Sequence, residues 1–597
     1  MKKKINLSVD GVAVSVPSDF TIMKSADSIG IHIPRLCYHS KLSLFGGCRI
    51  CVVEVEGMKN YPASCSTKVK EGMVVMTHSQ GIRHARKIIL ELIFANHSPN
   101  CQICEKNNQC ELQALAKQIG LNDFILEGER KRFPVDNSSP SIVRDPEKCI
   151  LCGRCVRVCE EVQGVNALTF SNRGFKTNVI AAYDMGVGKS VCVNCGQCVN
   201  VCPTGALSEH DHTSEVWSAI HNPEKIVIAQ IAPAVRVAIG EGFGNEPGKD
   251  MTYQAVTALR MLGVNIVFDT QFSADLTIME EASEFIQRFK NKGKLPLITS
   301  CSPGWIKFCE SFYPNLLENI STCKSPQQMM GAMIKTYYAK ESGINPKNIY
   351  SLSIMPCTAK KFEALRLEMN SSGYRDVDAV LTTRELIKMI KQAGISFNDL
   401  KASEFDSPMG CSSGAATIFG ATGGVMEAAL RTAYEFITGK ELVDINFNQV
   451  RGLEGIKEAT IPINGIEINV AIAHGLANTH ALLTDLVKGK KNYHFIEIMA
   501  CPGGCLGGGG QPYAKEPFEP FDKRLYEKRA QGLYNIDSGK SVHKSHCNPD
   551  IKTIYKDFLG KPLGNISHKL LHTHYSLRKP KGIATDLKNR VNLFTKK

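Results

Sequence analysis

The spacing of the cysteines is the strongest constraint on how this chain folds. The 597 residues include 23 cysteines, and most of them lie between Cys37 and Cys202 in closely spaced groups. Disulfide frameworks are usual in small secreted domains, whereas clustered cysteines in a long chain favour metal binding. Thiolates are the preferred ligands of iron–sulfur clusters. The N-terminal third is therefore predicted to fold around several metal centres.

Two of the cysteine groups repeat one another. One consists of Cys149, Cys152, Cys155 and Cys159, and the other of Cys192, Cys195, Cys198 and Cys202 followed by Pro203. In the two-cluster ferredoxin pattern, the fourth cysteine of each run binds the cluster of the other run. This predicts one 4Fe-4S cluster on Cys149, Cys152, Cys155 and Cys202, and a second on Cys192, Cys195, Cys198 and Cys159.

Residues 1–80 alternate short apolar runs with turns, which predicts a small β-rich domain. We expect strands at Ile5–Val9, Val12–Val16 and Ile50–Val55, and a helix near Ile22–Ser28. Four cysteines suit a 2Fe-2S site here, with tetrahedral zinc as the alternative because it uses the same ligands; they are Cys37, Cys48, Cys51 and Cys65. The segment resembles a plant-type ferredoxin domain of the β-grasp fold, although its cysteine spacing differs from the plant pattern.

A helical segment, Ala85–Asn96, leads into a histidine that stands at ligand spacing before three cysteines. These residues are His97, Cys101, Cys104 and Cys110. The alternative is a histidine with an ordinary polar role. We expect a 4Fe-4S site with one histidine and three cysteine ligands, because the segment resembles the histidine-ligated module of a respiratory complex I subunit.

From about residue 210, apolar strand-like runs alternate with helical segments such as Asp275–Arg288. Alternation of this kind predicts α/β layers with mostly parallel strands, in which ligands bind outside the carboxyl ends of the strands. The expected strands are Lys225–Ile231, Val264–Phe268, Leu295–Ile298, Ile349–Ile354, Ala379–Leu381, Glu467–Ile472 and Phe495–Ile498.

Three of these strands end in cysteines. Cys301 and Cys357 each follow an apolar run and precede a helical segment, and the third strand runs into Cys501, Cys505 and a glycine-rich loop ending at Pro512. Glycine permits close approach of bare backbone to a bulky group. A cluster site at the three strand ends is favoured over a simple glycine loop with two buried cysteines, because the pattern occurs three times.

Together, the three strand ends resemble the three signature motifs of the iron–iron (FeFe) hydrogenases, in the multi-cluster group. The order of the motifs, the flanking glycines and the Lys360 and Glu363 that follow Cys357 all fit. The resemblance implies reversible reduction of protons to dihydrogen at an H-cluster. That cofactor is a 4Fe-4S cubane bridged by a cysteine sulfur to a two-iron subcluster carrying CO, CN and azadithiolate. It also implies dedicated maturation proteins.

The resemblance assigns roles to individual residues. Cys357, Cys501 and Cys505 match cubane ligands, with Cys505 bridging, and Lys360 matches the residue that binds a cyanide. The two-iron pocket would be lined by Ala232, Pro233, Gln327, Met355, Phe419 and Met499. The proton path would run through Cys301, Glu281, Ser321, Glu284 and Arg288. Without the resemblance, Glu281 and Glu284 could equally form a solvated acidic helix face.

Ser302 departs from the family pattern, which has a second cysteine there as a cubane ligand. A serine oxygen is a hard, poor ligand for iron–sulfur iron. Three alternatives are open: Ser302 binds anyway, Cys301 takes over the ligand role, or the cubane has an open corner. Ala234, where a serine is usual, departs as well.

The expected architecture is a multidomain α/β protein with a C-terminal segment like the hydrogenase small subunit. The predicted domains are 1–80 with 2Fe-2S, 81–125 with the histidine-ligated 4Fe-4S cluster, 126–210 with two 4Fe-4S clusters, 211–515 with the H-cluster, and 516–597 as the small-subunit-like tail. In that tail, a metal site on His568, His572 and His574 is a less favoured alternative to ordinary packing.

The net charge of +13 predicts an acidic electron partner. Ferredoxin or NAD(P)-linked partner subunits are expected. Nucleic acid is not expected because the basic residues are scattered. No membrane segment or signal peptide is apparent, so a cytoplasmic location is expected. The alternatives in function are an electron-transfer or sensory module of low turnover, favoured by Ser302, and an iron–sulfur assembly factor, opposed by the full set of N-terminal cysteine groups.

Overall fold

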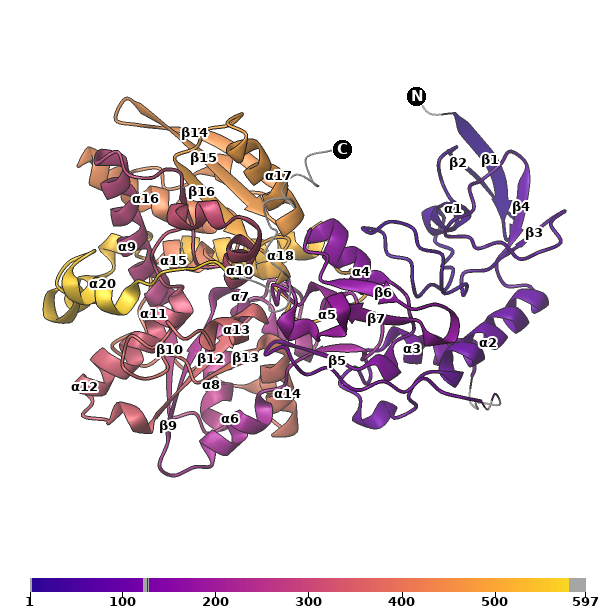
Figure 1. Ribbon diagram of the computed structural model, residues 1–597, viewed down its shortest axis with the longest axis horizontal. Helices are drawn as coiled ribbons and strands as arrows, with labels where there is room; N and C mark the ends of the chain where they lie inside the picture. Colours follow the sequence, from indigo (N-terminus) through magenta and orange to yellow (C-terminus); the bar gives the residue numbers. More distant parts are fainter. Residues whose placement is uncertain (1–2, 122–125, 127, 579–597) are drawn as a thin grey trace. The chain divides into compact units, whose positions relative to one another are not determined.

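The computed structural model describes residues 3–121, 126 and 128–578, and it divides into two compact units (Figure 1). The N-terminal unit comprises Met1–Tyr183, Gly196–His210 and Tyr513–Leu525. The large unit comprises Asp184–Cys195, Asp211–Pro512 and Tyr526–Lys597. The predicted tail residues 579–597 lie outside the described residues. None of the helices in the described ranges is long and apolar enough to cross a bilayer.

The N-terminal unit begins with a four-stranded mixed sheet in the order β2-β1-β4-β3. Its strands are β1 (Lys4–Val9), β2 (Val12–Pro17), β3 (Glu54–Val55) and β4 (Met73–Met76), and α1 (Ile22–Ser28) is the helix expected from the sequence. The expected strand over Ile50–Val55 is wrong except for its last two residues. The preceding backbone bonds to a loop instead, with Val53 N–H donating to the Pro62 carbonyl at 3.1 Å.

The rest of the N-terminal unit is built from short elements. Two antiparallel strand pairs, β5 with β8 and β6 with β7, accompany four helices. The elements are α2 (Gln80–Ala95), α3 (Glu111–Ile119), β5 (Ile142–Arg144), α4 (Arg154–Arg157), β6 (Leu168–Ser171), β7 (Asn178–Ala181), α5 (Gln197–Asn200) and β8 (Leu207–Glu209). The sequence repeat appears as a shared local geometry, because Gly153 and Gly196 both adopt left-handed backbone before α4 and α5 (φ 69° and 72°).

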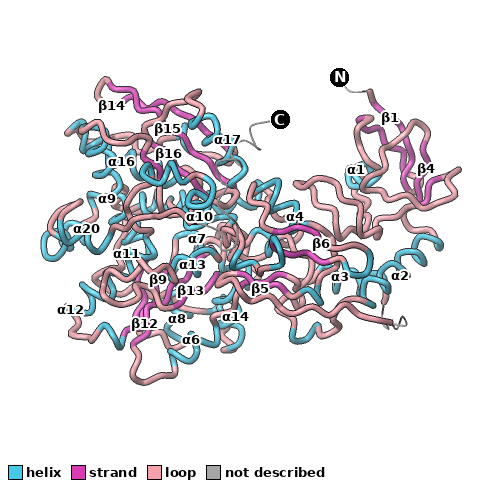
Figure 2. The backbone as a smooth tube through the Cα atoms, viewed as in Figure 1, coloured by secondary structure: helices cyan, strands magenta, loops and turns pink. Residues whose placement is uncertain are grey.

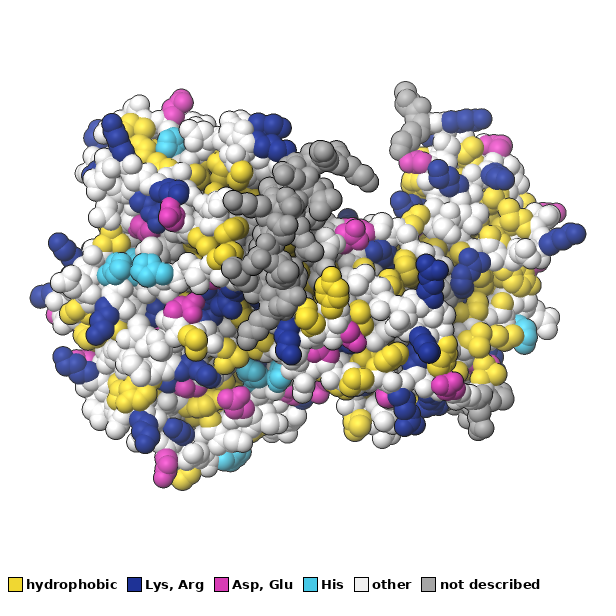
Figure 3. Space-filling view, viewed as in Figure 1, with side chains coloured by type: hydrophobic (Ala, Val, Ile, Leu, Met, Phe, Trp, Pro, Cys, Tyr) yellow, Lys and Arg dark blue, Asp and Glu magenta, His cyan; other side chains and the backbone are white. Residues whose placement is uncertain are grey.

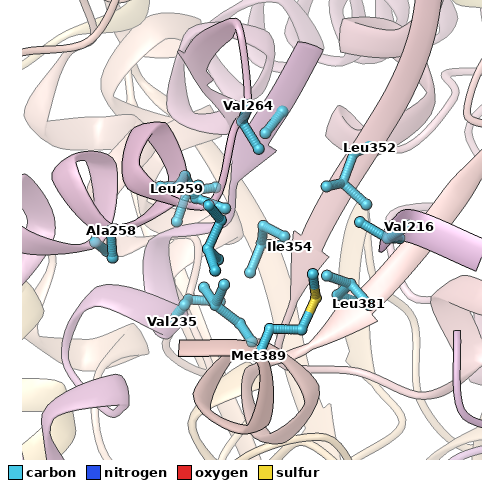
Figure 4. Close-up of a cluster of buried hydrophobic side chains, with 14 of the residues drawn as sticks. Val216, Val235, Ala258, Leu259, Val264, Leu352, Ile354, Leu381 and Met389 are labelled. Carbon is cyan, nitrogen blue, oxygen red and sulfur yellow. The ribbon is translucent and has the colours of Figure 1, made fainter. Parts of the chain in front are cut away.

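The large unit contains a fully parallel sheet in the order β10-β9-β12-β13. Its strands are β9 (Ile226–Ile231), β10 (Ile266–Asp269), β12 (Ile349–Met355) and β13 (Ala379–Thr382). Helices cover the sheet, and side chains from strands and helices meet in one core, including Val235, Leu259, Ile354 and Met389 (Figure 4). Near-continuous apolar runs such as Ile226–Ile231 are typical of strands buried on both faces.

The second sheet of the large unit is mixed, in the order β11-β16-β15-β14. Its strands are β11 (Leu297–Ile298), β14 (Ile456–Ile463), β15 (Ile466–His474) and β16 (Phe495–Met499). β14, which forms a hairpin with β15, was not expected from the sequence (Figure 2). The turn residues Asn464 and Gly465 both have positive φ, 51° and 78°, which is the backbone that a two-residue hairpin loop requires.

The helices of the large unit pack around the two sheets, and α9 carries the predicted proton-path residues Glu281, Glu284 and Arg288. Asp269 caps the start of α9 by accepting the Gln271 N–H at 2.9 Å. The helices are α6 (Thr213–Ile220), α7 (Pro233–Arg236), α8 (Thr252–Met261), α9 (Thr270–Lys290), α10 (Pro303–Phe312), α11 (Pro326–Met333), α12 (Ala339–Glu341), α13 (Ala359–Ala364), α14 (Thr383–Gln392), α15 (Gly414–Ile418), α16 (Gly424–Thr438), α17 (Leu476–Val487), α18 (Lys523–Gly539), α19 (Pro549–Ile554) and α20 (Asn565–Leu571).

Candidate active site

The three cysteine-bearing strand ends meet at one cavity of the large unit, about 80 Å³ in volume. β11 and β16 come from the mixed sheet and β12 from the parallel sheet, so the cavity lies where the carboxyl ends of both sheets converge. Every cluster-contacting residue predicted for the catalytic site lines it: Ala232, Pro233, Cys301, Ser302, Gln327, Met355, Cys357, Lys360, Phe419, Met499, Cys501 and Cys505.

Burial in the cavity raises the pKa of several of its thiols. Burial raises the pKa of Cys357, and the nearby Lys360 ammonium opposes that rise. Burial also raises the pKa of Cys505 to about 12, and a neighbouring Cys357 thiolate would raise it further. These thiols hold their protons until a cationic centre takes the protons' place, as expected for buried cluster ligands.

Glycines let the loop after β16 fold tightly against the other strand ends. A Cβ atom on Gly508 would lie 2.2 Å from the Pro356 carbonyl oxygen, just before Cys357. Gly504 has φ +75° and would bring a Cβ to 2.9 Å from the Thr422 backbone nitrogen. Only a residue without a side chain fits at these two positions. The glycine-rich composition is therefore explained by backbone packing around the cavity.

Lys360 is fixed at the cavity wall by two hydrogen bonds. Its ammonium donates to the Glu363 carboxylate at 2.9 Å and to the Cys301 carbonyl at 3.1 Å. Glu363 also accepts from the Ser325 hydroxyl at 2.8 Å and from the Gln327 amide at 3.1 Å. The ammonium is thus a positioned charge with a third donor left for a group in the cavity.

Ser302 and Cys301 are adjacent at the start of α10, and both line the cavity. The Ser302 hydroxyl oxygen accepts the Ala500 N–H at 3.2 Å, which places it beside Cys501. The pKa of Cys301 is raised well above its usual value, first by burial and then by the charge of Glu281. Ser302 therefore lies beside Cys501, one of the predicted cubane ligands, while Cys301 is close enough to Glu281 on α9 for that charge to raise its pKa.

A chain of hydrogen bonds leads from Glu281 to the partly exposed Arg288. Glu281 and Ser321 are hydrogen-bonded, the Ser321 hydroxyl donates to Glu284 at 3.0 Å, and Arg288 forms an ion pair with Glu284. Burial raises the pKa of Glu281 to about 8, and the Glu284 charge adds to that rise. A protonated Glu281 can donate to Ser321 while Ser321 donates to Glu284, so one consistent donor direction runs along the chain.

The N-terminal unit gathers four cysteines around a second cavity of about 20 Å³. They are Cys149, Cys152, Cys155 and Cys202, the set predicted for one 4Fe-4S cluster. Burial raises the pKa of Cys149 to about 11 and of Cys152 to about 12. Cys202 comes from the second sequence run, and the structure therefore combines the two runs at this cavity.

The first domain pairs its four cysteines. The neighbouring Cys48 thiol lowers the pKa of Cys37, and the neighbouring Cys65 thiol lowers the pKa of Cys51 in the same way. Cys37, Cys51 and Cys65 are buried and Cys48 is half-buried. The set offers four sulfur ligands in one small region, as a 2Fe-2S or zinc site needs.

His97 is buried, and its Nδ1 atom has no hydrogen-bond partner. Burial lowers the pKa of His97 to about 4, with a further contribution from the Lys148 charge, so its imidazole is neutral and able to bind a metal. Cys101, Cys104 and Cys110 follow on a short 3-10 turn and at the start of α3. A buried ring nitrogen without a hydrogen-bond partner is what we expect of a metal ligand.

The remaining set, Cys159, Cys192, Cys195 and Cys198, stays a prediction. Within the large unit, Cys195 lines the catalytic cavity, and its carbonyl lies 4.0 Å from the Cys501 sulfur. In the N-terminal unit, Cys159 accepts the Ala167 N–H at 3.2 Å and Cys198 is buried in α5. Of the second sequence run, Cys195 therefore lies at the wall of the catalytic cavity.

Several residues that support the site were not expected from the sequence. Thr322 donates to Glu284 at 3.3 Å and also contacts His572, and Ser325 holds Glu363. The histidines near the C-terminus were the available signal for His572. Both ring nitrogens of His572 are engaged, by Thr322 and by Glu280, which favours ordinary packing over the alternative three-histidine metal site.

Comparison with known proteins identifies the class of this fold and site. Residues 225–509 match the C-terminal domain of the iron-only hydrogenase large subunit, and residues 523–578 match the iron hydrogenase small subunit. Upstream, residues 2–80 match a 2Fe-2S iron–sulfur cluster binding domain, 86–124 the iron–sulfur binding region of NADH-ubiquinone oxidoreductase G, and 148–206 a 4Fe-4S dicluster domain. The chain belongs to the iron-only (FeFe) hydrogenases, which interconvert protons and dihydrogen.

Individual relatives extend over nearly the whole chain. It is 48% identical to NADP-reducing hydrogenase subunit HndD of Solidesulfovibrio fructosivorans, over 96% of this chain and 99% of that protein. It is 44% identical to iron hydrogenase 1 of Clostridium pasteurianum, over 95% of this chain and 99% of that one. The solved structure of apo [FeFe]-hydrogenase HydA1 from Chlamydomonas reinhardtii is 42% identical, with a TM-score of 0.55, covering 62% of this chain and 99% of that one.

The donor set of the cavity fits the H-cluster of this family. Several soft thiols, among them Cys357, Cys501 and Cys505, surround a largely apolar space together with one fixed ammonium and close-packed glycine backbone. Soft sulfur ligands select iron–sulfur clusters. Ser302 is the one member of the predicted ligand set whose chemistry fits poorly.

Proposed function

We propose that Cys357, Cys501 and Cys505 hold the H-cluster cubane, with Cys505 bridging to the two-iron subcluster. When bound, the cofactor supplies the redox chemistry that joins two protons and two electrons into dihydrogen. The cavity that these three thiols share with Lys360 is the observation that carries the proposal. The Ser302 hydroxyl oxygen would take the fourth ligand position of the cubane.

Lys360 would bind a cyanide of the subcluster. Its ammonium is held by Glu363 and by the Cys301 carbonyl, and both contacts keep the charge directed along the cavity wall. The subcluster pocket is lined by Ala232, Pro233, Gln327, Met355, Phe419 and Met499. Their mostly apolar side chains exclude water, which strengthens the interaction of Lys360 with an anionic ligand.

Protons travel between Cys301 and solvent through α9. Cys301 exchanges a proton with Glu281, Glu281 with Ser321 and Glu284, and Glu284 with solvent at the partly exposed Arg288, whose guanidinium stays protonated and holds Glu284 in an ion pair. The raised pKa of Glu281, about 8, suits a group that must both hold and release a proton near neutral pH.

Substitution of the two innermost relay residues tests this assignment. Cys301→Ala and Glu281→Gln should retain the clusters and lose at least about 10²-fold in turnover, because each removes a group that passes a proton. Dihydrogen evolution with a reduced dye measures the rate, and the infrared bands of bound CO and CN measure occupancy of the site.

The same experiment separates the two roles open to Cys301. If Cys301→Ala loses the cubane, Cys301 is the ligand and the relay assignment is wrong. If both variants keep parental turnover, the relay does not run through these residues. Glu467→Gln, at an exposed glutamate on β15 of the mixed sheet, is the matched control and should behave as the parent.

The accessory clusters feed electrons to the cavity. We infer one 2Fe-2S cluster in a β-grasp domain at 1–80, a histidine-ligated 4Fe-4S cluster at 81–125 and two 4Fe-4S clusters at 126–210. The catalytic domain is 211–515 and the small-subunit-like segment is 516–597. The cysteine cavity, the neutral His97 and the matched family ranges support this division.

Iron analysis of matured protein should approach about twenty iron atoms per chain if all these clusters are present. A zinc-rich, colourless preparation would contradict it.

The electron partner is ferredoxin or an NAD(P)-linked subunit, in the cytoplasm. The net charge of +13 supports an acidic partner, and the name of the Solidesulfovibrio relative supports a link to NADP. Lys and Arg side chains are spread over the visible face of each unit rather than gathered in one patch (Figure 3). Turnover with purified ferredoxin, compared with turnover with NADPH plus partner subunits, distinguishes the two.

A further inference from the structure

A second hydrogen-bonded branch leaves the proposed relay at Glu284. The Thr322 hydroxyl lies 3.3 Å from the Glu284 carboxylate and 2.8 Å from Nδ1 of His572. On the other side of the imidazole, Nε2 of His572 lies 3.0 Å from the Glu280 carboxylate. Glu280 also accepts hydrogen bonds from the Tyr555 hydroxyl and from the Leu563 N–H at 2.7 Å.

The branch joins parts of the chain that are far apart in the sequence. Glu280 and Glu284 lie on α9, Thr322 precedes α11, and His572 follows α20 near the end of the described chain. His572 forms a backbone bridge with Cys323, and the flanking Thr573 N–H donates to the Thr322 carbonyl at 2.8 Å. The imidazole is therefore held against the relay by its own backbone.

We propose that His572 stores a proton for the relay, receiving it from Glu284 through the Thr322 hydroxyl. This rests on the proposed relay function of Glu281 and Glu284. Dihydrogen formation consumes two protons, and a filled side site beside the route supplies one of them without a second passage from solvent. The branch makes Thr322 and His572 positioning and storage residues rather than catalytic ones.

The proton transfer balances within the branch. The Glu284 carboxyl gives its proton to Oγ1 of Thr322, while Thr322 gives its own hydroxyl proton to Nδ1 of His572. His572 becomes an imidazolium whose Nε2–H already faces the Glu280 carboxylate, so a buried ion pair replaces a neutral imidazole beside a carboxylate. Return of the proton follows the same bonds in reverse, and no oxidant or reductant is needed.

Several titratable groups surround His572. The titratable groups that face it are Glu280 and Glu284 on α9, Tyr555 after α19, Cys323, and His568 and His574 of its own segment. His572 itself is buried, and His568 stacks on its ring at 4.7 Å. Histidine side chains reach the surface over α20 (Figure 3). One imidazolium between two carboxylates is electrostatically favourable, provided that the stacked His568 stays neutral. Burial and the neighbouring histidines lower the His568 pKa, consistent with that condition.

Thr322 offers the sharpest test because its hydroxyl can be removed without changing its shape. In matured holoenzyme, Thr322→Val should lower dye-driven dihydrogen evolution several-fold, less than the roughly 10²-fold expected for a link on the main route. It should also shift the pH profile of turnover. Thr322→Ser, which keeps the hydroxyl, should restore both. His572→Gln should behave as Thr322→Val. Ring ¹⁵N signals of labelled histidine, assigned by their loss in His572→Gln, should show the His572 imidazole gaining a proton as the pH falls.

A control variant separates storage from simple anchoring. The Ser371 hydroxyl donates to the Leu570 carbonyl at 2.9 Å and so holds the same segment without touching the branch. Ser371→Ala should keep the parental pH profile. If Thr322→Val matches Thr322→Ser in rate and profile, or if His572 never becomes doubly protonated, the branch is overturned. If Glu281→Gln also keeps full turnover, the relay itself has failed. If Glu281→Gln loses turnover while Thr322→Val keeps the parental rate and pH profile, the relay stands and only the branch through His572 is rejected.

Discussion

Glu281 is a buried carboxyl whose ionisation the protein resists. Its pKa is raised from 4.5 to about 8 by burial and by Glu284, and its Oε1 atom has no hydrogen-bond partner. The folded state therefore holds this proton more tightly than the unfolded chain does. The associated stability is fully present below about pH 4.5 and is lost as the pH rises to about 8.

Glu281→Gln should accordingly gain stability relative to the parent as the pH rises from about 5 to 9, because the glutamine stays neutral. Thermal unfolding midpoints of both proteins across that pH range measure the effect. The exposed Glu467→Gln variant should track the parent at every pH. Parallel curves for Glu281→Gln and the parent would show that the carboxyl is not held protonated.

Ser302 is the predicted ligand position whose chemistry suits iron–sulfur iron least. Its hydroxyl oxygen accepts the Ala500 N–H beside Cys501, where the family pattern has a thiolate. We expect Ser302→Cys to increase cubane retention and to shift the midpoint potential, because sulfur binds iron–sulfur iron better than oxygen does. A redox titration of the active-site signal, with iron content measured alongside, checks this. An unchanged midpoint and content in Ser302→Cys would move the ligand role to Cys301.

The loop after β16 is the element on which the cavity depends most. Its backbone packs so closely against the end of β12 that a Cβ on Gly508 would overlap the Pro356 carbonyl oxygen. Gly508→Ala should displace the 3-10 turn Cys505–Gly507, at an overpacking cost of about 1–3 kcal/mol.

The expected result for Gly508→Ala is lower active-site iron and weaker CO and CN infrared bands, with the accessory clusters retained. Gly539→Ala is the matched control, because Gly539 has open space around its Cβ position and ends α18. Equal iron content in the two variants would mean that the loop adjusts to the methyl group.

At the scale of the whole molecule, the charge of +13 governs encounter with the electron partner. Opposite net charges speed association, and salt screens them over about 8 Å at physiological ionic strength. Turnover driven by an acidic ferredoxin should fall as salt rises, while turnover with a neutral dye should stay nearly constant. The same salt response with both donors would argue against an acidic partner.

Many helices and strands could be predicted from local sequence patterns. The run Ile226–Ile231 and the segment Asp275–Arg288 were recognisable as strand and helix, because apolar periodicity is a local property. The Ile50–Val55 strand is shorter than expected, because Cys51 and Val53 form only one isolated antiparallel bridge, Val52 with Ala63, before β3 begins. β14 was missed, although its Asn464–Gly465 turn is a recognisable hairpin signal.

The sequence by itself determined the chemistry of this protein: the thiols at three strand ends, the repeated cysteine runs and the histidine before Cys101. Those features can be recognised in the sequence because ligand spacing and turn glycines are set by a few neighbouring residues. Only the tertiary structure decided that two separate sheets bring Cys357 and Cys501 to one cavity. It alone decided that burial raises the pKa of Glu281, and that His572, 250 residues after Thr322, lies within hydrogen-bonding distance of the Thr322 hydroxyl. Burial and long-range contact depend on how the whole chain packs, which no local pattern records.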